Sequence, residues 1–365
     1  MRRAAARGVL GAVVTVTLLG ALALRSGAEE SPPGPVPDTA SASEPSTTTT
    51  STTTAGPPAG AVDVVPTPGA ASSGDEIESL GATTRRTYTF VDTSRATPCI
   101  DAPDRTLPVT VFYPSTGSSF PVVLVGPGSG ASQRAVARDD AEAFAARGYL
   151  AVAMSFPCTN LPGLSTTDPQ VALDIYSQPG DVSFVLSSLL AKSSTIADRL
   201  FGLLDPARVG YTGTSSGAVT GLLLFNTCCA DPRIDAIVAA KGFPLPTGAG
   251  LPVPGTYDWA LPVALYQWGA CFDDVTPYEP AYAAFRAANP PKLFMQDATG
   301  NHSTPVTFPP GTYEAFFDRY VALDPSPVLV ETLVGAGSDP HYAYDLAVPG
   351  IDPRVTLPAC VNFTG

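Results

Sequence analysis

The sequence is poor in histidine and in basic residues. Only two histidines, His302 and His341, occur among its 365 residues. Lys and Arg number 20 against 33 Asp and Glu, which gives a net charge of −13 at pH 7. Such a balance repels the phosphates of nucleic acids and the surfaces of anionic membranes, so we expect neither as a partner.

The sequence also lacks the ligand spacing of a metal site. Its six cysteines include no CxxC pair, and only two histidines occur in the whole chain. We therefore expect neither a metal nor an organic cofactor. An even number of cysteines is consistent with disulfides formed in an oxidising compartment, but the pairing among them remains open.

The N-terminal 80 residues are predicted to contain an export signal and a linker rather than a folded domain. Residues 1–28 combine a basic cluster, an apolar run over 8–24 and small residues such as Ala23 and Ala28, which is the layout of a signal peptide with candidate cleavage positions. An uncleaved N-terminal membrane anchor is the alternative. Residues 29–80 are dominated by Ser, Thr, Pro and Ala and predict a disordered linker. We expect a secreted protein, with cell-surface or wall association through this segment as an open possibility.

Residues 81–365 are predicted to form one α/β domain. Apolar runs bounded by Pro and Gly alternate with segments that have helical periodicity. This order favours a mostly parallel central sheet with helices on both faces. The predicted strands are 106–114, 120–126, 149–155, 207–213, 234–240, 261–268 and 292–296, and the predicted helices are 139–148, 182–190, 218–225, 280–288 and 312–320.

The stretch "RVGYTGTSSGAVTGLLL" contains the motif GxSxG between a predicted strand and a predicted helix. In this context the motif predicts a sharp turn that presents Ser215 as a nucleophile, with glycines at the crowded positions. The backbone NH of Ser216, at the helix N-terminus, would stabilise a developing oxyanion. The alternative is a glycine-rich connection without chemistry.

A second oxyanion donor is predicted at the end of an earlier buried strand. The segment "VVLVGPGSGAS" passes from that strand into a loop with three glycines, where backbone NH groups can face a ligand. We expect the backbone NH of Ser129 to be this donor. An ordinary glycine-containing loop is the alternative.

A serine nucleophile needs a base, and the two histidines make the search short. His302 directly follows the last predicted strand, from where its loop can return over the nucleophile. His341 comes after a further helix and an extra apolar segment, and we expect a packing or surface role for it.

The base needs a buried carboxylate to orient it. Asp273 follows the strand over 261–268 in the loop "GACFDDVTP" and is the expected acid. Its neighbour Asp274 is expected in a solvated turn. Asp297 and Asn301 are competitors, and Asp297 would be the natural acid if the base were His341.

The order Ser215, Asp273, His302, each after a successive strand, resembles the α/β-hydrolase superfamily. Segments such as "LPVTVFYP", "PGDVSFVLSSLL" and "QDATGNHSTP" resemble its secreted branch of platelet-activating-factor acetylhydrolases, chlorophyllase-like and dienelactone-hydrolase-like enzymes and cutinase-type esterases.

This resemblance implies a cofactor-independent hydrolase that cleaves carboxylic esters through an acyl-enzyme on Ser215. We expect a monomer acting on a small-molecule or lipid ester. Two alternatives stay open: an acyltransferase that uses the same triad, and a non-catalytic, cell-wall-associated binding protein on a hydrolase scaffold.

Overall fold

The computed structural model describes residues 77–79, 81–130, 132–163, 169–248 and 253–360. All of them belong to one compact unit. The predicted signal peptide or anchor lies outside the described residues, as does the predicted linker except for 77–79. Those three residues form the first strand of the sheet, so regular structure begins just before the expected domain start at residue 81.

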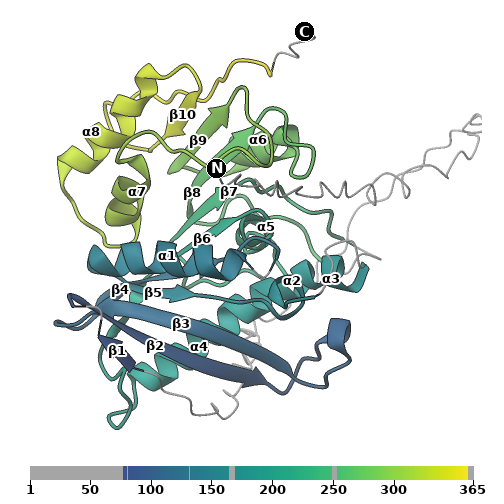
Figure 1. The fold of residues 1–365 in the computed structure, drawn as a ribbon. Helices are drawn as coiled ribbons and strands as arrows, with labels where there is room; N and C mark the ends of the chain where they lie inside the picture. Colours follow the sequence, from purple (N-terminus) through teal and green to yellow (C-terminus); the bar gives the residue numbers. More distant parts are fainter. Residues whose placement is uncertain (1–76, 80, 131, 164–168, 249–252, 361–365) are drawn as a thin grey trace, which may run out of the picture. The chain divides into compact units, whose positions relative to one another are not determined.

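A mixed, mostly parallel sheet crosses the domain (Figure 1). The described strands are β1 (Ile77–Ser79), β2 (Thr83–Asp92), β3 (Arg105–Pro114), β4 (Phe120–Gly126), β5 (Leu150–Ala153), β6 (Leu204–Thr214), β7 (Ala236–Ala240), β8 (Ala264–Ala270), β9 (Lys292–Asp297) and β10 (Tyr342–Asp345). Their spatial order is β1-β2-β3-β5-β4-β6-β7-β8-β9-β10. The run from β5 to β9 is parallel, and the strands outside it pair antiparallel.

Helices cover both faces of this sheet. They are α1 (Gln133–Ala146), α2 (Pro157–Asn160), α3 (Pro169–Leu173), α4 (Gln178–Ser193), α5 (Ser216–Leu223), α6 (Tyr278–Ala287), α7 (Thr312–Tyr320) and α8 (Pro327–Gly335), with 3₁₀ turns η1 (Pro98–Ile100), η2 (Asp174–Ser177) and η3 (Ala336–Ser338). α1, α7 and α8 share one core with the sheet, and α4 and α5 share the other. In the view of Figure 1, α1 crosses in front of β4 and β5.

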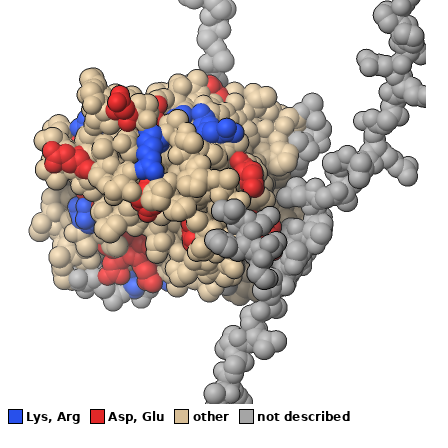
Figure 2. All heavy atoms as spheres, turned by 90° about the horizontal axis from the view of Figure 1, so that it is seen from above, with Lys and Arg blue, Asp and Glu red and all other residues tan. Residues whose placement is uncertain are grey.

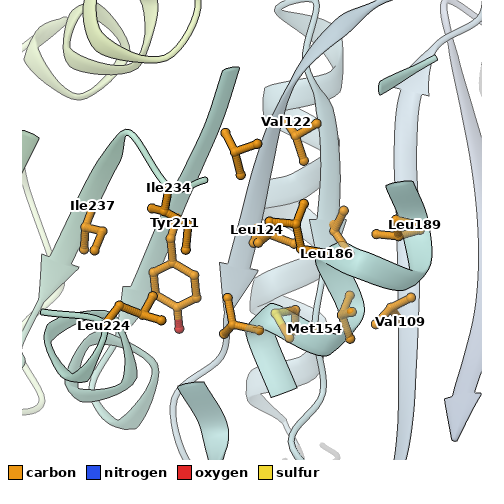
Figure 3. Close-up of a cluster of buried hydrophobic side chains, with 14 of the residues drawn as sticks. Val109, Val122, Leu124, Met154, Leu186, Leu189, Tyr211, Leu224, Ile234 and Ile237 are labelled. Carbon is orange, nitrogen blue, oxygen red and sulfur yellow. The ribbon is translucent and has the colours of Figure 1, made fainter. Parts of the chain in front are cut away.

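The continuous apolar strands are explained by burial on both faces. All seven residues of β4 are buried, and alternate side chains enter the two cores. Figure 3 shows one core, in which Leu186 and Leu189 of α4 pack near Val109 and Leu124 of the sheet. The buried sheet fixes the ends of β4, β6, β8 and β9, from which the predicted site residues extend.

The predicted fold class is confirmed: the strand order and the helices on both faces fit an α/β-hydrolase fold. Every predicted strand and helix is present. β4 and α7 have the predicted boundaries and the others are shifted, most of all α1, which begins at Gln133 rather than at residue 139. The prediction did not include β1, β2, β10, α2, α3 or α8. β2 carries charged and polar residues on its half-exposed positions, and α8 is rich in β-branched residues, so neither gives a strong periodic signal.

All six cysteines are paired. The disulfides are Cys99–Cys158, Cys228–Cys229 and Cys271–Cys360. Such bonds are typical of proteins in oxidising compartments. No helix within the described ranges is long and apolar enough to cross a bilayer. On the face seen in Figure 2, acidic and basic side chains are scattered among uncharged ones.

Candidate active site

Ser215 lies at the turn between β6 and α5, in an unusual backbone conformation. Its φ is 55° and its ψ is −121°, a region that non-glycine residues rarely adopt and that is concentrated at functional sites. Its NH donates to the carbonyl of Ala240 at the end of β7, 2.9 Å away, which ties the turn to the neighbouring strand. The half-buried side chain faces a cavity. This is the strand–turn–helix context that the motif requires.

The glycines of the motif are required by close packing. A Cβ on Gly217 would lie 2.2 Å from the carbonyl oxygen of Gly126, and a Cβ on Gly213 would lie 2.4 Å from the carbonyl carbon of Gly217. Any side chain at either position would therefore push α5 away from β4 and β6. The crowding expected from the sequence is confirmed.

His302 lies within hydrogen-bond distance of the serine. Its Nε2 is 3.1 Å from Ser215 Oγ, and its loop follows β9 as expected. His341 is elsewhere: its Nδ1 is 2.8 Å from the side-chain oxygen of Gln296, next to β10. The structure therefore brings only the first of these histidines to the serine.

Asp273 contacts the other side of the His302 ring. Its Oδ2 is 2.8 Å from His302 Nδ1, and Oδ1 is 3.0 Å away. The carboxylate also accepts hydrogen bonds from the NH groups of Val275 and Thr276 and from the hydroxyl of Thr276. Burial alone would raise the pKa of Asp273, but the hydrogen bonds from His302 and Thr276 outweigh burial and lower this pKa below its ordinary value of 3.8. Asp273 is thus held as a carboxylate beside the imidazole.

The competing acidic and amide side chains serve local turns. Asp274 is exposed to solvent. Asp297 accepts hydrogen bonds from the NH groups of Thr299 and Gly300 within its own turn. Asn301 accepts from the NH of Ser303 in the same way.

The two residues expected to donate to an oxyanion are Ser216, which follows Ser215 in the chain, and Ser129, in the loop after β4. Ser216 is the first residue of α5, where an NH has no partner within the helix. Ser129 lines the same cavity as Ser215, and its NH meets no acceptor among the described residues. Gly128, the residue before Ser129, lies against this turn: a Cβ there would be 3.3 Å from the carbonyl oxygen of Thr214 and 3.4 Å from Ser215 Cβ.

Two residues near this site were not predicted from the sequence. Thr276 donates to Asp273, as described above. Lys241, at the end of β7, has a φ of 56° and donates from Nζ to the carbonyl oxygens of His302, 2.7 Å away, and of Thr304. Burial lowers the pKa of Lys241, although the charges of Asp273 and Asp297 act in the opposite direction. The sequence contains one hint of this contact with the His302 loop: a single lysine directly follows the apolar run "AIVAA".

A cavity of about 630 Å³ opens at Ser215 and His302, a volume that suits a small organic ligand. It runs between α1, the strand ends and the loop after His302. Its lining includes Ser129, Gln133, Val136, Asp140, Val238, Val306, Phe308 and Tyr313. The part of the chain that the structure describes contains no group of three or more His, Cys, Asp or Glu that could hold a metal ion.

Comparisons with known proteins do not assign the chain to a family. No protein-family model and no curated protein matches the chain. Among solved structures, a ferulic acid esterase from Streptomyces cinnamoneus is similar, with 21% identity and a TM-score of 0.48 over 69% of this chain and 93% of that chain. At this level of similarity the neighbour carries no argument about chemistry or substrate, so the site is interpreted from its own geometry.

Proposed function

We propose that the chain is a serine hydrolase that cleaves carboxylic esters through an acyl-enzyme on Ser215. The observation that carries this proposal is the continuous contact from Ser215 Oγ to His302 Nε2, at 3.1 Å, and from His302 Nδ1 to Asp273, at 2.8 Å. A nucleophile, a base and an orienting carboxylate in this order are sufficient for acyl transfer.

The chemistry follows from these contacts. Ser215 Oγ attacks the ester carbonyl carbon while His302 Nε2 takes the hydroxyl proton, and Asp273 stabilises the resulting imidazolium. The backbone NH groups of Ser129 and Ser216 donate to the tetrahedral oxyanion. His302 then protonates the departing alcohol, which leaves an acyl group on Ser215. Water, deprotonated by His302, releases the acid and restores the serine.

Secretion is part of the proposal. It is supported by the three disulfides and by the signal-like layout of residues 1–28. The Ser/Thr/Pro-rich linker over 29–80 would separate the catalytic domain from a surface if the N-terminus stays anchored.

The first test measures hydrolysis of short p-nitrophenyl acyl esters by the full chain, produced in an oxidising compartment. We expect turnover by the wild type and its loss in Ser215→Ala and His302→Ala. An organophosphonate should label the wild type at Ser215, as located by peptide mass spectrometry.

A control variant makes this test specific. His341→Ala removes the histidine that contacts Gln296, away from Ser215, and should keep activity. A folded wild-type protein with neither turnover nor label would refute the hydrolase proposal and favour a binding protein on the same scaffold. Transfer of the acyl group to an added alcohol in preference to water would instead favour an acyltransferase.

A further inference from the structure

We infer that Asn160 is a positioning residue that aims the oxyanion donor of Ser129, and that a buried hydrogen-bond network extends this control to the helix bearing Ser216. The inference rests on the proposed function, because it assigns a role within that site. Asn160 belongs to α2, a helix of four residues, and its side chain is fully buried.

The first step is the contact between Asn160 and the loop after β4. Asn160 Nδ2 donates to the carbonyl oxygens of Gly128, at 2.7 Å, and of Gly130, at 3.1 Å. The carbonyl of Gly128 and the NH of Ser129 belong to one planar peptide unit, in which they point in opposite directions. Holding the carbonyl of Gly128 therefore turns the NH of Ser129 away from Asn160. Ser129 itself lines the cavity in front of Ser215.

The next peptide unit of this loop is held as well. The NH of Gly130 donates to the carbonyl of Thr159, at 2.7 Å. Asn160 and Thr159 thus fix two successive peptide units, on both sides of Ser129. A loop with glycines at 126, 128 and 130 has many alternative backbone conformations, so these contacts select one of them.

The network then continues to the nucleophile helix. Gln178, at the start of α4, donates from Nε2 to Thr159 Oγ1 at 3.0 Å. On the other side, Thr220 Oγ1 is 2.5 Å from Gln178 Oε1 and 2.9 Å from the carbonyl oxygen of Ser216. Gln178 and Thr220 are fully buried. The first turn of α5 is therefore linked to the segment that holds the Ser129 loop.

α2 is itself anchored against the body of the domain. A single helical turn has no stability of its own. The disulfide between Cys99 and Cys158 ties it to η1, and the NH of Phe156 donates to Asn160 Oδ1 at 3.0 Å. Asn160 is therefore fixed before it meets the loop, as a positioning residue must be.

The chemistry requires an amide at residue 160. The side chain donates from its nitrogen to two carbonyls and accepts at its oxygen from an NH. Asn160→Asp keeps the shape but sets a carboxylate oxygen against the carbonyls of Gly128 and Gly130. Asn160→Leu keeps the approximate size and removes every hydrogen bond.

The test compares these two variants with Asn226→Leu. Asn226 is a second fully buried asparagine, which donates to Thr247 Oγ1 and accepts from the NH of Cys228, away from the cavity lining. The measurements are kcat and KM for a p-nitrophenyl ester, and the affinity for a trifluoromethyl ketone, which forms an oxyanion on the serine. Thermal unfolding of each protein gives the folded fraction.

We expect Asn160→Leu and Asn160→Asp to lower kcat about 10- to 100-fold, a part of the ~10²- to 10³-fold loss known for removal of one oxyanion donor. KM should stay within about 3-fold, and the trifluoromethyl ketone should lose affinity in parallel with kcat/KM. Asn226→Leu should lower the unfolding temperature without changing kcat per folded molecule.

Thr220→Val is the second variant, because it removes only one hydroxyl from the network and keeps the residue's shape. We expect it to lower kcat about 3- to 10-fold at unchanged KM. If the wild type is active and Thr220→Val and the soluble Asn160 variants all keep its kcat, the inference is overturned and the proposed function stands. The inference is also overturned if Asn226→Leu lowers kcat per folded molecule as much as the Asn160 variants do. A folded wild type with no turnover and no label on Ser215 would overturn both.

Discussion

Two clusters of hydrogen-bonded side chains in this domain differ in whether one side is open to the cavity. The first joins Arg105 at the start of β3 to Asp174 of η2 and Asp181 of α4, with guanidinium–carboxylate distances of 2.5 to 3.0 Å. The second is the contact from Asp273 through His302 to Ser215. Arg105 is fully buried, whereas the side chain of His302 is 25% exposed.

The two clusters differ in whether all of their polar groups have partners within the protein. The guanidinium of Arg105 meets two carboxylates, each through two oxygens. Burial alone would lower the pKa of Arg105, but its hydrogen bonds to Asp181 and Asp174 and their charges outweigh burial and raise it, so the group stays charged. Such a closed cluster fixes η2 and α4 against the sheet. The serine end of the other cluster opens into the cavity, so its protons can move to a bound molecule.

Asp273→Asn should have the largest effect. The amide cannot hold His302 in the tautomer that accepts the serine proton, so kcat/KM for an ester should fall on the order of 10³- to 10⁴-fold. Asp274→Asn, on the same loop but exposed, is the matched control and should keep activity. Equal losses in the two variants would contradict the assignment of Asp273.

Arg105→Met should have the next largest effect, on stability rather than on chemistry. It leaves the buried carboxylate of Asp174 without its cation and leaves Asp181 with only the partly exposed Arg95, 2.9 Å away, and we expect the free energy of unfolding to fall by about 3 to 5 kcal/mol. Arg147→Met is the control, since the pair between Arg147 and Asp318 is partly exposed and should contribute at most about 1 kcal/mol. Denaturant titration measures both. A loss no larger in Arg105→Met than in the control would show that the closed cluster adds little.

The smallest effect concerns pH. The pKa of Asp273 is lowered in the folded protein, so its stabilising contribution is complete above the ordinary value of 3.8 and is lost as the pH falls through the lower folded value. The difference in unfolding free energy between the wild type and Asp273→Asn should therefore shrink across this acid range. Unfolding measured between about pH 6 and 3 checks it. A difference that grows toward low pH would contradict the sign.

The sequence predicted the open cluster far better than the closed one. Three local signals indicated the open cluster: GxSxG between a strand and a helix, a carboxylate after a later strand, and a histidine after the next strand. Their order along the chain resembles that of the α/β-hydrolase superfamily. The structure brings Ser215, Asp273 and His302 together as that order implies. Their catalytic roles remain a prediction until the variants are measured.

The supporting contacts depend on packing between distant segments and gave no local signal. Asn160 and Gly128 are 32 residues apart, and Arg105 and Asp181 are 76 apart. The local sequence around Asn160 or Arg105 does not show that the side chain is buried, since either residue type is common at exposed positions. The disulfide pairing was left open for the same reason, since no spacing rule brings Cys271 to Cys360.

The close contact of Gly217 with Gly126 has a consequence for how such a protein can change its substrate. Because no side chain fits at Gly213 or Gly217, substitutions at these two positions cannot reshape the cavity. Variation is open instead on the face of α1 that carries Val136 and on the loop that carries Phe308. A library of variants at those two walls, with Gly213 and Gly217 unchanged, is the direct way to seek a new ester specificity.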